Sequence, residues 1–457
     1  MHTGRLFGTS GIRGIVNKDL SPDFCRRVAL AIGTTLPPAS TVCIATDTRI
    51  SRDVIKEAVT AGLLSCSINV VDLGILPTPA LALLTRELGF AAGIMVTASH
   101  NPPEFNGIKL FTGNSLGYSP AQEAEIEKTY FEQKFRKGKR GTFEQAQNMK
   151  QRYLSFIKGK LSRPGFNHQL KVVVDPGNGA ASKFASDIFV QMGLDVIPVN
   201  DEPNGLSPGR SPEPKADTLQ GTVNFLRQHN ADLAICFDGD ADRVVFCDKE
   251  GFLGFNEPIA FISRLAVKRK GKKKIATTVE TGTLLDLAVK DLGVEVVRGR
   301  VGDVAVAYLA QELDAALGVE QVGVYILPEA GYYPDSIFAS LILLSQLSDA
   351  GEIRQFFQDI PRLFFEKAKV FCPDELKEAA MAQAKEKAHL FAPDEIPIKI
   401  GTLDGLRLDF LDSWVLIRAS GTEPVIRVIS ESTSQTQTNE LISKGKKLVQ
   451  SLVEASR

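Results

Sequence analysis

The feature that most constrains the fold is a pattern that occurs three times along the chain. Residues 41–74, 170–200 and 273–303 each read as a short apolar strand, a turn with an acidic residue, an amphipathic helix and a second strand after a glycine-containing turn. A strand-length apolar run followed by helical spacing of apolar residues indicates a β-α-β unit. Any α/β protein can contain several such units, but a spacing of about one domain length favours three repeated α/β domains.

Length and changes of composition predict four domains. At roughly 100 to 200 residues per domain, the 457 residues favour three or four domains over one. The highly charged segment 121–151 predicts a boundary near its end, and after Pro361 the composition changes to "ELKEAAMAQAKEKAHLFAPDE" and then to alternating strands. Such an ending is typical of a smaller α+β domain. We therefore expect domains over residues 1–150, 151–255, 256–365 and 366–457.

Charge and cysteine usage limit the classes of partner. The 53 Lys and Arg residues nearly balance the 54 Asp and Glu residues, so nothing favours nucleic acid or an acidic membrane, and small molecules are the expected partners. Six cysteines are scattered without a C-x-x-C pair, which suits reduced core cysteines better than disulfides or a zinc site. The chain shows neither a secretory apolar segment at its start nor a run of 18 apolar residues, so we expect a cytoplasmic protein.

A polar turn follows the apolar run "AAGIMVTAS" at residues 91–99, which reads as a buried parallel strand. In open α/β sheets, ligand groups gather at the carboxyl ends of the strands, so Ser99 lies where a nucleophile would be useful. A serine hydroxyl needs activation, and His100, Lys109 or a metal ion could supply it. The alternative is a serine that only stabilises the turn before Asn106.

The segment "DGDADR" places three aspartates at alternate positions between two apolar strands. Asp238, Asp240 and Asp242 can converge on one hard cation, with a small residue between each pair. An EF-hand needs Gly and Glu where this chain has Arg243 and Lys249, so calcium sensing is excluded. A D-x-D phosphatase with Asp238 as the nucleophile leaves the third aspartate unexplained, and two flanking buried strands disfavour a merely solvated acidic turn.

Two further segments are suited to phosphate. In "LIRASGTEPVIRV" a guanidinium, two hydroxyls and a flexible run of backbone N–H groups fall in one turn, and a second arginine follows on the next strand. The alternative for this segment is a hairpin turn with outward polar residues. The glycine-rich "FGTSGIRG" presents Arg13, although it could equally be a turn with a surface arginine. The candidate phosphate ligands of the first segment are Arg418, Ser420, Gly421, Thr422 and Arg427.

Taken together, these motifs resemble those of the α-D-phosphohexomutase family in their residues and in their order along the chain. The resemblance covers nearly the whole chain. The resemblance implies four domains around a central cleft, three α/β domains with mixed sheets and a C-terminal α+β domain of the TATA-box-binding-protein type. It implies that Ser99 is a phosphoserine, that Asp238, Asp240, Asp242 and a Ser99 phosphate oxygen hold Mg²⁺, and that Lys109 is the general acid or base. By the same resemblance, His100, Arg13 and Arg243 surround the transferring group, and the fourth domain clamps the other phosphate.

The sugar-selecting loop departs from the family pattern. Its best-known form is G-E-x-S-G-H, but here Glu320 and Gly323 remain while Val322 and Val324 replace the serine and the histidine. The loss of two hydrogen-bonding side chains predicts weaker discrimination between epimers or a less polar sugar substituent. Backbone groups with Glu320, or Glu329 and the tyrosines after it, are the alternative sources of recognition.

The expected reaction interconverts hexose 6-phosphate and hexose 1-phosphate, with a bound hexose 1,6-bisphosphate between them. "SGTEP" and Asp303 in "RVGD" resemble the phosphoglucosamine mutases, and "FGTSGIRG" is similar to their archaeal-type members, so glucosamine phosphate is the favoured substrate. A phosphomannomutase/phosphoglucomutase of broad specificity is the alternative within the family. A non-catalytic sugar-phosphate binding protein and a phosphatase are the alternatives from other classes. The chain is expected to be a monomer or a homodimer.

Overall fold

Three of the four sheets share one strand order. The structure is a computed structural model and describes residues 5–8, 10–161, 166–167, 169–386, 388, 391, 397–421 and 423–456. In each of the three sheets, a central strand has parallel neighbours on both sides, and one of these neighbours pairs antiparallel with the strand that follows it. The shared order runs β3-β2-β4-β5, β8-β7-β9-β10 and β12-β11-β13-β14.

The repeated segments of the sequence form the matching parts of these sheets, as predicted. The central strands are β2 (Thr41–Thr46), β7 (Lys171–Asp175) and β11 (Lys274–Thr278), and the crossover helices after them are α2 (Arg52–Ser65), α6 (Ala185–Gln191) and α9 (Leu284–Val289). The other strands of the shared order are β3 (Asn69–Ile75), β4 (Ala92–Val96), β5 (Phe105–Thr112), β8 (Asp195–Pro198), β9 (Leu233–Phe237), β10 (Val244–Cys247), β12 (Glu295–Gly299), β13 (Leu317–Glu320) and β14 (Val324–Ile326). The first sheet is extended by β1 (Ile12–Ile15) and β6 (Phe143–Gln145).

Helices cover the three mixed sheets. Ser21 begins α1 (Pro22–Thr35), where its hydroxyl accepts a hydrogen bond from Phe24 N and a proline occupies the first turn. The remaining helices of this part are α3 (Thr78–Glu87), α4 (Pro120–Glu132), α5 (Met149–Lys160), α7 (Gln220–Gln228), α8 (Asn256–Lys270), α10 (Asp303–Glu312), α11 (Ser336–Leu344) and α12 (Glu352–Phe356). No helix among the described residues is long and apolar enough to cross a membrane.

The fourth sheet is antiparallel throughout and has its own core. Its order is β15-β19-β18-β17-β16, and the strands are β15 (Phe364–Phe371), β16 (Lys399–Gly401), β17 (Leu406–Asp409), β18 (Ser413–Ala419) and β19 (Val425–Ser432). The two helices that accompany it are α13 (Asp374–Glu386) and α14 (Gln435–Ala455). This arrangement confirms the smaller α+β domain that the sequence predicts.

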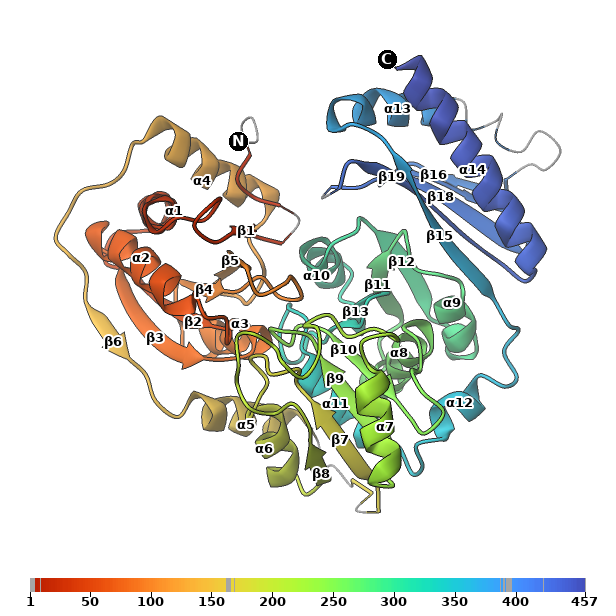
Figure 1. Ribbon diagram of the computed structural model, residues 1–457, viewed down its shortest axis with the longest axis horizontal. Helices are drawn as coiled ribbons and strands as arrows, with labels where there is room; N and C mark the ends of the chain where they lie inside the picture. Colours follow the sequence, from red (N-terminus) through yellow and green to blue (C-terminus); the bar gives the residue numbers. More distant parts are fainter. Residues whose placement is uncertain are drawn as a thin grey trace.

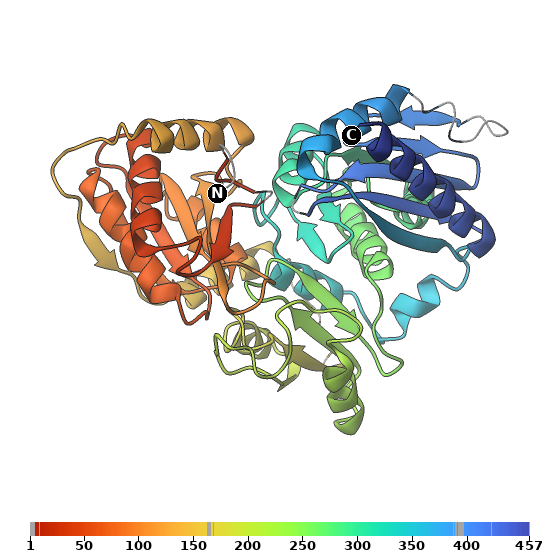
Figure 2. The same cartoon turned by 45° about the horizontal axis from the view of Figure 1, so that its top comes forward.

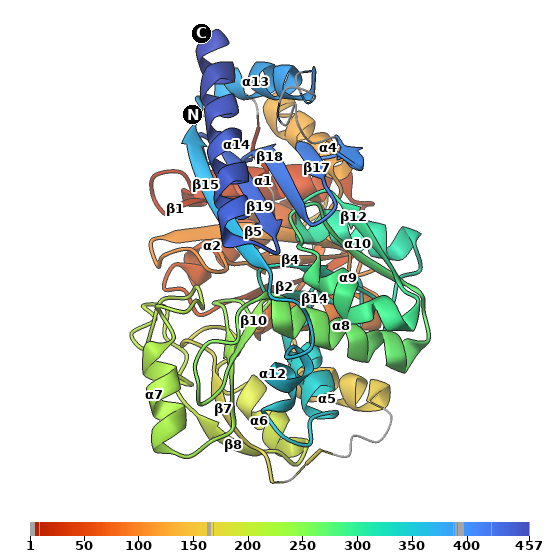
Figure 3. The same cartoon turned by 90° about the vertical axis from the view of Figure 1, so that its right-hand side faces the viewer.

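The apolar cores explain how the domains are joined. One cluster contains buried residues from all three central strands, among them Cys43, Val172 and Ile275. The fourth sheet has a separate cluster and touches the third through a small group that includes Val279 and Trp414. Figure 1 shows the first sheet at the left and the fourth at the upper right, with the others between and below them. In Figure 2 the fourth sheet with α13 and α14 lies opposite the first, and in Figure 3 the second sheet lies farthest from the fourth. All six cysteines are buried and free, as expected.

Candidate active site

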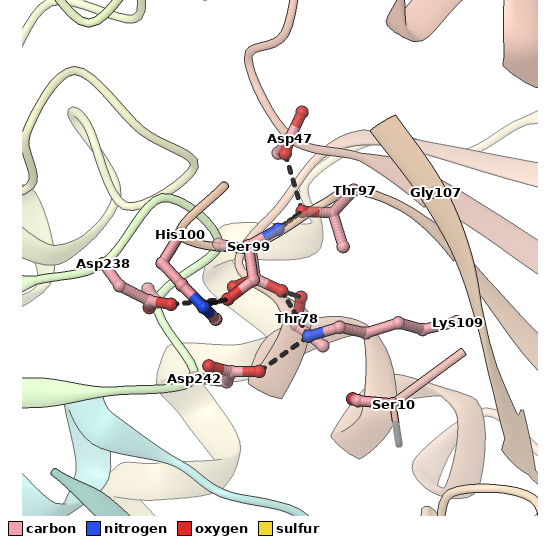
Figure 4. Close-up of polar contacts among 12 residues, drawn as sticks. Ser10, Asp47, Thr78, Thr97, Ser99, His100, Gly107, Lys109, Asp238 and Asp242 are labelled. Atoms are coloured by element: carbon pink, nitrogen blue, oxygen red, sulfur yellow. Dashed lines mark hydrogen bonds and ion pairs between the residues drawn. The ribbon is translucent and has the colours of Figure 1, made fainter. Parts of the chain in front are cut away.

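The predicted catalytic residues meet where the first and second domains face each other. Ser99 follows β4 and Lys109 lies on β5 opposite Met95, so two neighbouring strands of the first sheet deliver them. The three aspartates lie in the loop that joins β9 to β10 of the second sheet. Figure 4 shows Asp238 and Asp242 directed at Ser99 and Lys109.

The backbone of Ser99 is held in an unusual conformation. Its φ of +51° lies in the left-handed region, which costs free energy for a residue with a side chain. Thr97 Oγ1 accepts a hydrogen bond from Ser99 N at 2.8 Å and donates to Asp47 Oδ2 at 2.6 Å. The buried Arg49 donates to Ser99 O at 2.8 Å and also to three later carbonyls of the loop, those of Asn101, Pro102 and Phe105. These contacts fix the serine in the conformation that directs its hydroxyl toward the aspartates.

The hydroxyl of Ser99 has two partners. It donates to Asp238 Oδ2 at 2.7 Å, and His100 Nδ1 lies 3.2 Å from the same oxygen. Burial, together with the positive charges of Arg243 and Arg13, lowers the pKa of His100 to about 3. The imidazole is therefore neutral at physiological pH, which makes it a hydrogen-bonding partner of Ser99 and a weak base.

Lys109 connects all three α/β domains. Its ammonium donates to Asp240 Oδ2 at 2.8 Å, to Asp242 Oδ2 at 2.7 Å and to Tyr333 Oη at 3.3 Å. Burial opposes the charged form, but the two carboxylates outweigh it and raise the pKa of Lys109 above its usual value. In this arrangement the side chain is a cation, buried beside the Ser99 hydroxyl.

The three aspartates fit a divalent metal ion. One oxygen from each lies within 4.8 Å of the others, and Asp240 Oδ1 and Asp242 Oδ1 are buried without a hydrogen-bond partner. An unpartnered buried carboxylate oxygen is costly unless a cation satisfies it, and an all-oxygen set is the one that Mg²⁺ prefers. Burial, with the charges of Asp242 and Asp240, raises the pKa of Asp238, as expected where carboxylates crowd without an ion.

The third domain reaches the same centre through two segments. Val244 N donates to Gly323 O at 2.9 Å. The loop that contains Gly323 therefore lies against the start of β10, directly after the three aspartates. Gly323 has a φ of +83° and no room for a β-carbon against Val244 O, so a glycine is required there. Glu320 accepts from Gly302 N at 2.8 Å, and burial with the neighbouring Asp303 raises its pKa to about 7.

The two valines of the sugar loop serve packing. Val324 is buried in an apolar cluster with Leu116 of the first domain, and Val322 packs against that cluster. The sequence leaves two alternative sources of sugar recognition open, and Glu329 belongs to the second. It is paired with Arg269 and Lys270 of α8. Of the tyrosines after it, Tyr333 extends toward the centre, because its hydroxyl donates to Asp242 Oδ2 at 2.9 Å, whereas Tyr332 packs against the apolar cluster.

The predicted phosphate ligands of the fourth domain form a separate group. Arg418 and Arg427 are opposite each other on β18 and β19. Arg418 pairs with Glu280 Oε1 at 3.1 Å and with Asp404 Oδ2 at 3.0 Å, whereas Arg427 Nη2 contacts Ser420 Oγ at 3.3 Å and Glu423 Oε2 at 3.1 Å. Gly421 is exposed in the turn between the strands, and Thr422 lies outside the described residues.

Arg13 and Arg243 complete the surroundings of Ser99. Arg13 lies on β1 opposite Gly107 and donates to Asn101 Oδ1 at 2.9 Å, while its Nε atom is buried without a partner. Arg243 Nε lies 4.0 Å from Asp242 Oδ1. A pocket between the first and third domains is lined by Ser10, Lys109 and Tyr333, among others.

Three residues of the site, Thr78, Asp47 and Arg49, were not identified from the sequence. Thr78, at the start of α3, donates from its backbone and its hydroxyl to Asp240. Nothing in its local sequence marks it, and the contact of Tyr333 with Asp242 was likewise not predicted, since each partner is more than 90 residues away. Asp47 and Arg49 carry a usable signal, because Asp47 is the acidic residue of the first repeated turn.

Four family models match the chain in order. They are the phosphoglucomutase/phosphomannomutase alpha/beta/alpha domains I, II and III, at residues 4–137, 151–251 and 256–364, and the C-terminal domain, at residues 368–444. A probable phosphoglucosamine mutase of Pyrococcus abyssi is 37% identical over 454 residues, 98% of this chain and 99% of that protein. A phosphoglucomutase/phosphomannomutase of Thermococcus kodakarensis is 34% identical over 98% of this chain and 99% of that protein. A solved structure from Burkholderia thailandensis, of a phosphoglucomutase/phosphomannomutase family protein, superimposes with a TM-score of 0.84 at 25% identity, over 99% of this chain and 98% of its own.

Proposed function

The chain belongs to the phosphoglucomutase/phosphomannomutase family, and on that premise we propose that it interconverts glucosamine 6-phosphate and glucosamine 1-phosphate. The observation that carries the reaction is the Ser99 hydroxyl, buried and 2.7 Å from Asp238, in one centre with a buried cation and two unpartnered carboxylate oxygens. Phosphoryl transfer depends chiefly on positioning and on neutralising oxygen charge. A buried serine among such groups suits that chemistry.

The side chains of the centre take distinct roles in this proposal. Ser99 Oγ carries a phosphoryl group, gives it to the free hydroxyl of the sugar phosphate and takes back the group at the other end of the resulting hexose 1,6-bisphosphate. Lys109 serves the sugar hydroxyl as general acid or base and neutralises phosphoryl oxygens, and Arg13 and Arg243 add positive charge around Ser99. His100, neutral because of its low pKa, orients the serine oxygen.

Asp238, Asp240, Asp242 and an oxygen of the Ser99 phosphate would hold Mg²⁺. The ion would supply positive charge to the oxygens of the transferring group. In the apo arrangement Lys109 occupies the Oδ2 atoms of Asp240 and Asp242 and leaves their Oδ1 atoms unsatisfied. The carboxylates therefore retain oxygens for an ion while the lysine stays in contact with them.

The fourth domain would hold the phosphate that is not reacting. Arg418, Ser420, Gly421, Thr422 and Arg427 supply the donors, and Glu320 with Gly323 would contact the sugar between the two ends. A bisphosphorylated intermediate must turn over in the cleft so that each end meets Ser99 in turn. A clamp that accepts either phosphate keeps the sugar bound during that step.

Glucosamine is favoured over glucose and mannose by the relatives named as phosphoglucosamine mutases and by Asp303. The phosphomannomutase/phosphoglucomutase alternative is favoured by the relative of that name at 34% identity. We also propose the domain boundaries given above, which the ends of the four family matches support, and a cytoplasmic location, which the six buried free cysteines support.

The test follows phosphorus NMR on purified protein with Mg²⁺ and a trace of glucose 1,6-bisphosphate. The 6-phosphates of glucosamine, glucose and mannose are supplied in separate tubes, beside a Ser99→Ala variant. Ser182→Ala is the matched control, because Ser182 Oγ is buried without a partner. We expect glucosamine 1-phosphate to form fastest, with no product from Ser99→Ala and full activity in the control. Faster conversion of glucose or mannose identifies the broad-specificity enzyme, free inorganic phosphate without isomer identifies a phosphatase, and binding without reaction identifies a sensor.

A further inference from the structure

The acidic residue in each repeated turn pairs with an arginine. Asp47 Oδ2 lies 3.1 Å from Arg49 Nε, and Asp175 Oδ2 lies 2.9 Å from Arg210 Nε. Each of these pairs lies within a single domain, the first or the second, and its arginine also donates to a backbone carbonyl. These two pairs therefore stabilise loops of their own domain. In the third repeat the acidic residue is Glu280, and its partner is Arg418 of the fourth domain. This third pair therefore joins a repeated turn to the group that would bind the substrate phosphate.

The carboxylate of Glu280 is fixed between two cations. Its Oε1 accepts from Arg418 Nη1 at 3.1 Å, and its Oε2 lies 3.6 Å from Lys367 Nζ on β15. Its side chain is only 11% exposed. Arg407 holds the surrounding backbone, because its Nη1 donates to Val279 O at 2.7 Å and to Thr281 O at 3.3 Å. These contacts hold the backbone of the turn and place the carboxylate of Glu280 beside Arg418.

A phosphate in the clamp changes the charge balance around Glu280. Each clamp arginine already has carboxylate partners, Glu280 and Asp404 for Arg418 and Glu423 for Arg427. A dianionic phosphate that takes donors from Arg418 would leave Lys367, 3.6 Å away, as the cation beside Glu280, and would place a second anion next to this nearly buried carboxylate. Such a poorly compensated charge is costly, because little water reaches it. A substrate that brings its own positive charge to this position removes the cost.

We propose that Glu280 is a specificity-determining residue that binds the ammonium group of an amino sugar whose 1-phosphate lies in the fourth-domain clamp. The inference rests on the proposed function and names the residue that selects its substrate. In glucosamine 1-phosphate the amino group is on C2, next to the carbon that carries the phosphate, so it lies beside the clamp. With the 6-phosphate in the clamp, the amino group lies at the other end of the sugar, near Ser99. Glucose and mannose present a neutral hydroxyl at C2 and leave Glu280 poorly compensated, which selects against them.

The test measures equilibrium binding by calorimetry in Ser99→Ala protein with Mg²⁺, so that each sugar phosphate stays as added. The ligands are the 1-phosphates and 6-phosphates of glucosamine and of glucose. We expect Glu280→Gln to raise the Kd of glucosamine 1-phosphate by about tenfold, or about 1.4 kcal/mol. The Kd of glucose 1-phosphate should stay the same or fall, and that of glucosamine 6-phosphate should change less than threefold. Glu423→Gln, which removes the carboxylate beside Arg427, is the matched control and should affect both 1-phosphates equally.

Two outcomes would overturn the proposal. Equal weakening of both 1-phosphates by Glu280→Gln would mean that the residue acts only through Arg418, and unchanged binding of all four ligands would mean that it does not face the sugar. Binding of glucose 6-phosphate that stays the same or tightens shows that the clamp of the variant is folded. If the Glu280→Gln variant no longer binds glucose 6-phosphate, the Glu280→Asp variant is used in its place. We then expect a smaller loss of selectivity for glucosamine 1-phosphate, and an equal loss of affinity for both 1-phosphates would contradict the proposal. Failure of the proposed function has a different readout, namely no glucosamine 1-phosphate from the unmutated enzyme in the NMR assay.

Discussion

Individual charges in the active centre balance one another in the absence of an ion. Lys109 is a buried cation whose partners are the two carboxylates that keep unsatisfied oxygens. Removing one partner of a buried pair leaves the other charge uncompensated, at a typical cost of about 3 to 5 kcal/mol. The centre therefore depends on the ammonium group of Lys109 for its stability, and its unpartnered oxygens can accept a metal ion as a second cation.

Lys109→Met should expose this dependence. In EDTA we expect the free energy of unfolding to fall by roughly 3 kcal/mol, because Asp240 and Asp242 lose their common partner. Mg²⁺ should stabilise the variant more than the unmutated protein, since the two carboxylates then have no lysine to neutralise them. The measurement is urea unfolding with and without Mg²⁺. Lys215→Met, which removes an exposed lysine from the exposed Glu213, should cost about 1 kcal/mol or less and respond to Mg²⁺ like the unmutated protein. An equal response of both variants would contradict the prediction.

Glu320 should make sugar binding depend on pH. Burial raises its pKa to about 7, so the carboxylate that can accept from sugar hydroxyls or pair with an ammonium group is present mainly above pH 7. Between pH 6 and pH 8 its charged fraction rises about tenfold, and affinity should rise with it. The measurement is the affinity of the unmutated protein divided by that of Glu320→Gln at each pH. The protonation of the ligand affects both affinities equally and cancels in this ratio. A ratio that stays constant from pH 6 to pH 8 would show that Glu320 does not contact the sugar in its charged form.

The same residue has the opposite effect on stability. Its pKa in the folded state lies above the value of 4.5 in the unfolded chain, so the folded state binds more protons between those values. The contribution of Glu320 to stability is therefore present at low pH and is lost as the pH rises from about 4.5 to 7. A site that binds through this carboxylate gains affinity over the range in which the apo protein loses stability.

At the scale of elements, the loop after β4 is stabilised by residues that directly follow β2. Arg49 donates to four carbonyls of that loop and pairs with Asp47, so one guanidinium holds Ser99 in its left-handed conformation. A lysine carries the same charge but cannot reproduce the fork of donors. The acidic turn of the first repeat thus shapes the loop that carries Ser99.

Arg49→Lys should therefore slow chemistry more than it weakens binding. We expect the rate of Ser99 phosphorylation by glucose 1,6-bisphosphate to fall by about a hundredfold, because a serine displaced by about 1 Å loses that much. The Kd of the sugar phosphate should change less than threefold, and amide exchange should increase in residues 99–105. Arg52→Lys is the control, since Arg52 donates to Thr48 O and pairs with Asp53, and both partners lie outside the loop. Loss of binding and rate in equal measure would assign Arg49 a general structural role.

The repeated elements could be read from the sequence, while the contacts between them could not. Strand-length apolar runs and helical spacing are local, so β2, β7 and β11 with their crossover helices follow from 3.6- and 2-residue periodicity. The motifs around Ser99, Asp238 and Arg418 carry chemistry in adjacent residues and were also accessible. Thr78 and Tyr333 contribute through packing between distant segments, which no local pattern encodes. Val322 and Val324 were read as a change in sugar contacts, but Val324 is buried in the apolar cluster beneath the loop.

For the whole molecule, the distribution of apolar cores predicts which parts can move. The three α/β domains share one continuous cluster, whereas the fourth domain has its own and meets the third through a small apolar group and through polar groups such as Glu280, Arg407 and Glu431. Polar interfaces between domains resemble transient protein interfaces and permit relative motion. The clamp can therefore shift against the centre while Ser99, Lys109 and the aspartates keep their positions.

Phosphorylation of Ser99 should test the junction between the first two domains. The phosphate adds close to two negative charges beside Asp238, Asp240 and Asp242, of which the last two are paired with Lys109. In EDTA we expect repulsion to separate the Ser99 loop from the metal loop, so that amide exchange rises at residues 97–105 and 238–243 and small-angle scattering shows a larger radius of gyration. Mg²⁺ should reverse both changes, because the ion binds phosphate and carboxylates together. Ser99→Ala protein treated with the same bisphosphate is the control and should show neither change. Identical exchange and scattering of the two forms in EDTA would mean that Lys109, Arg13 and Arg243 already neutralise the phosphate without a metal ion.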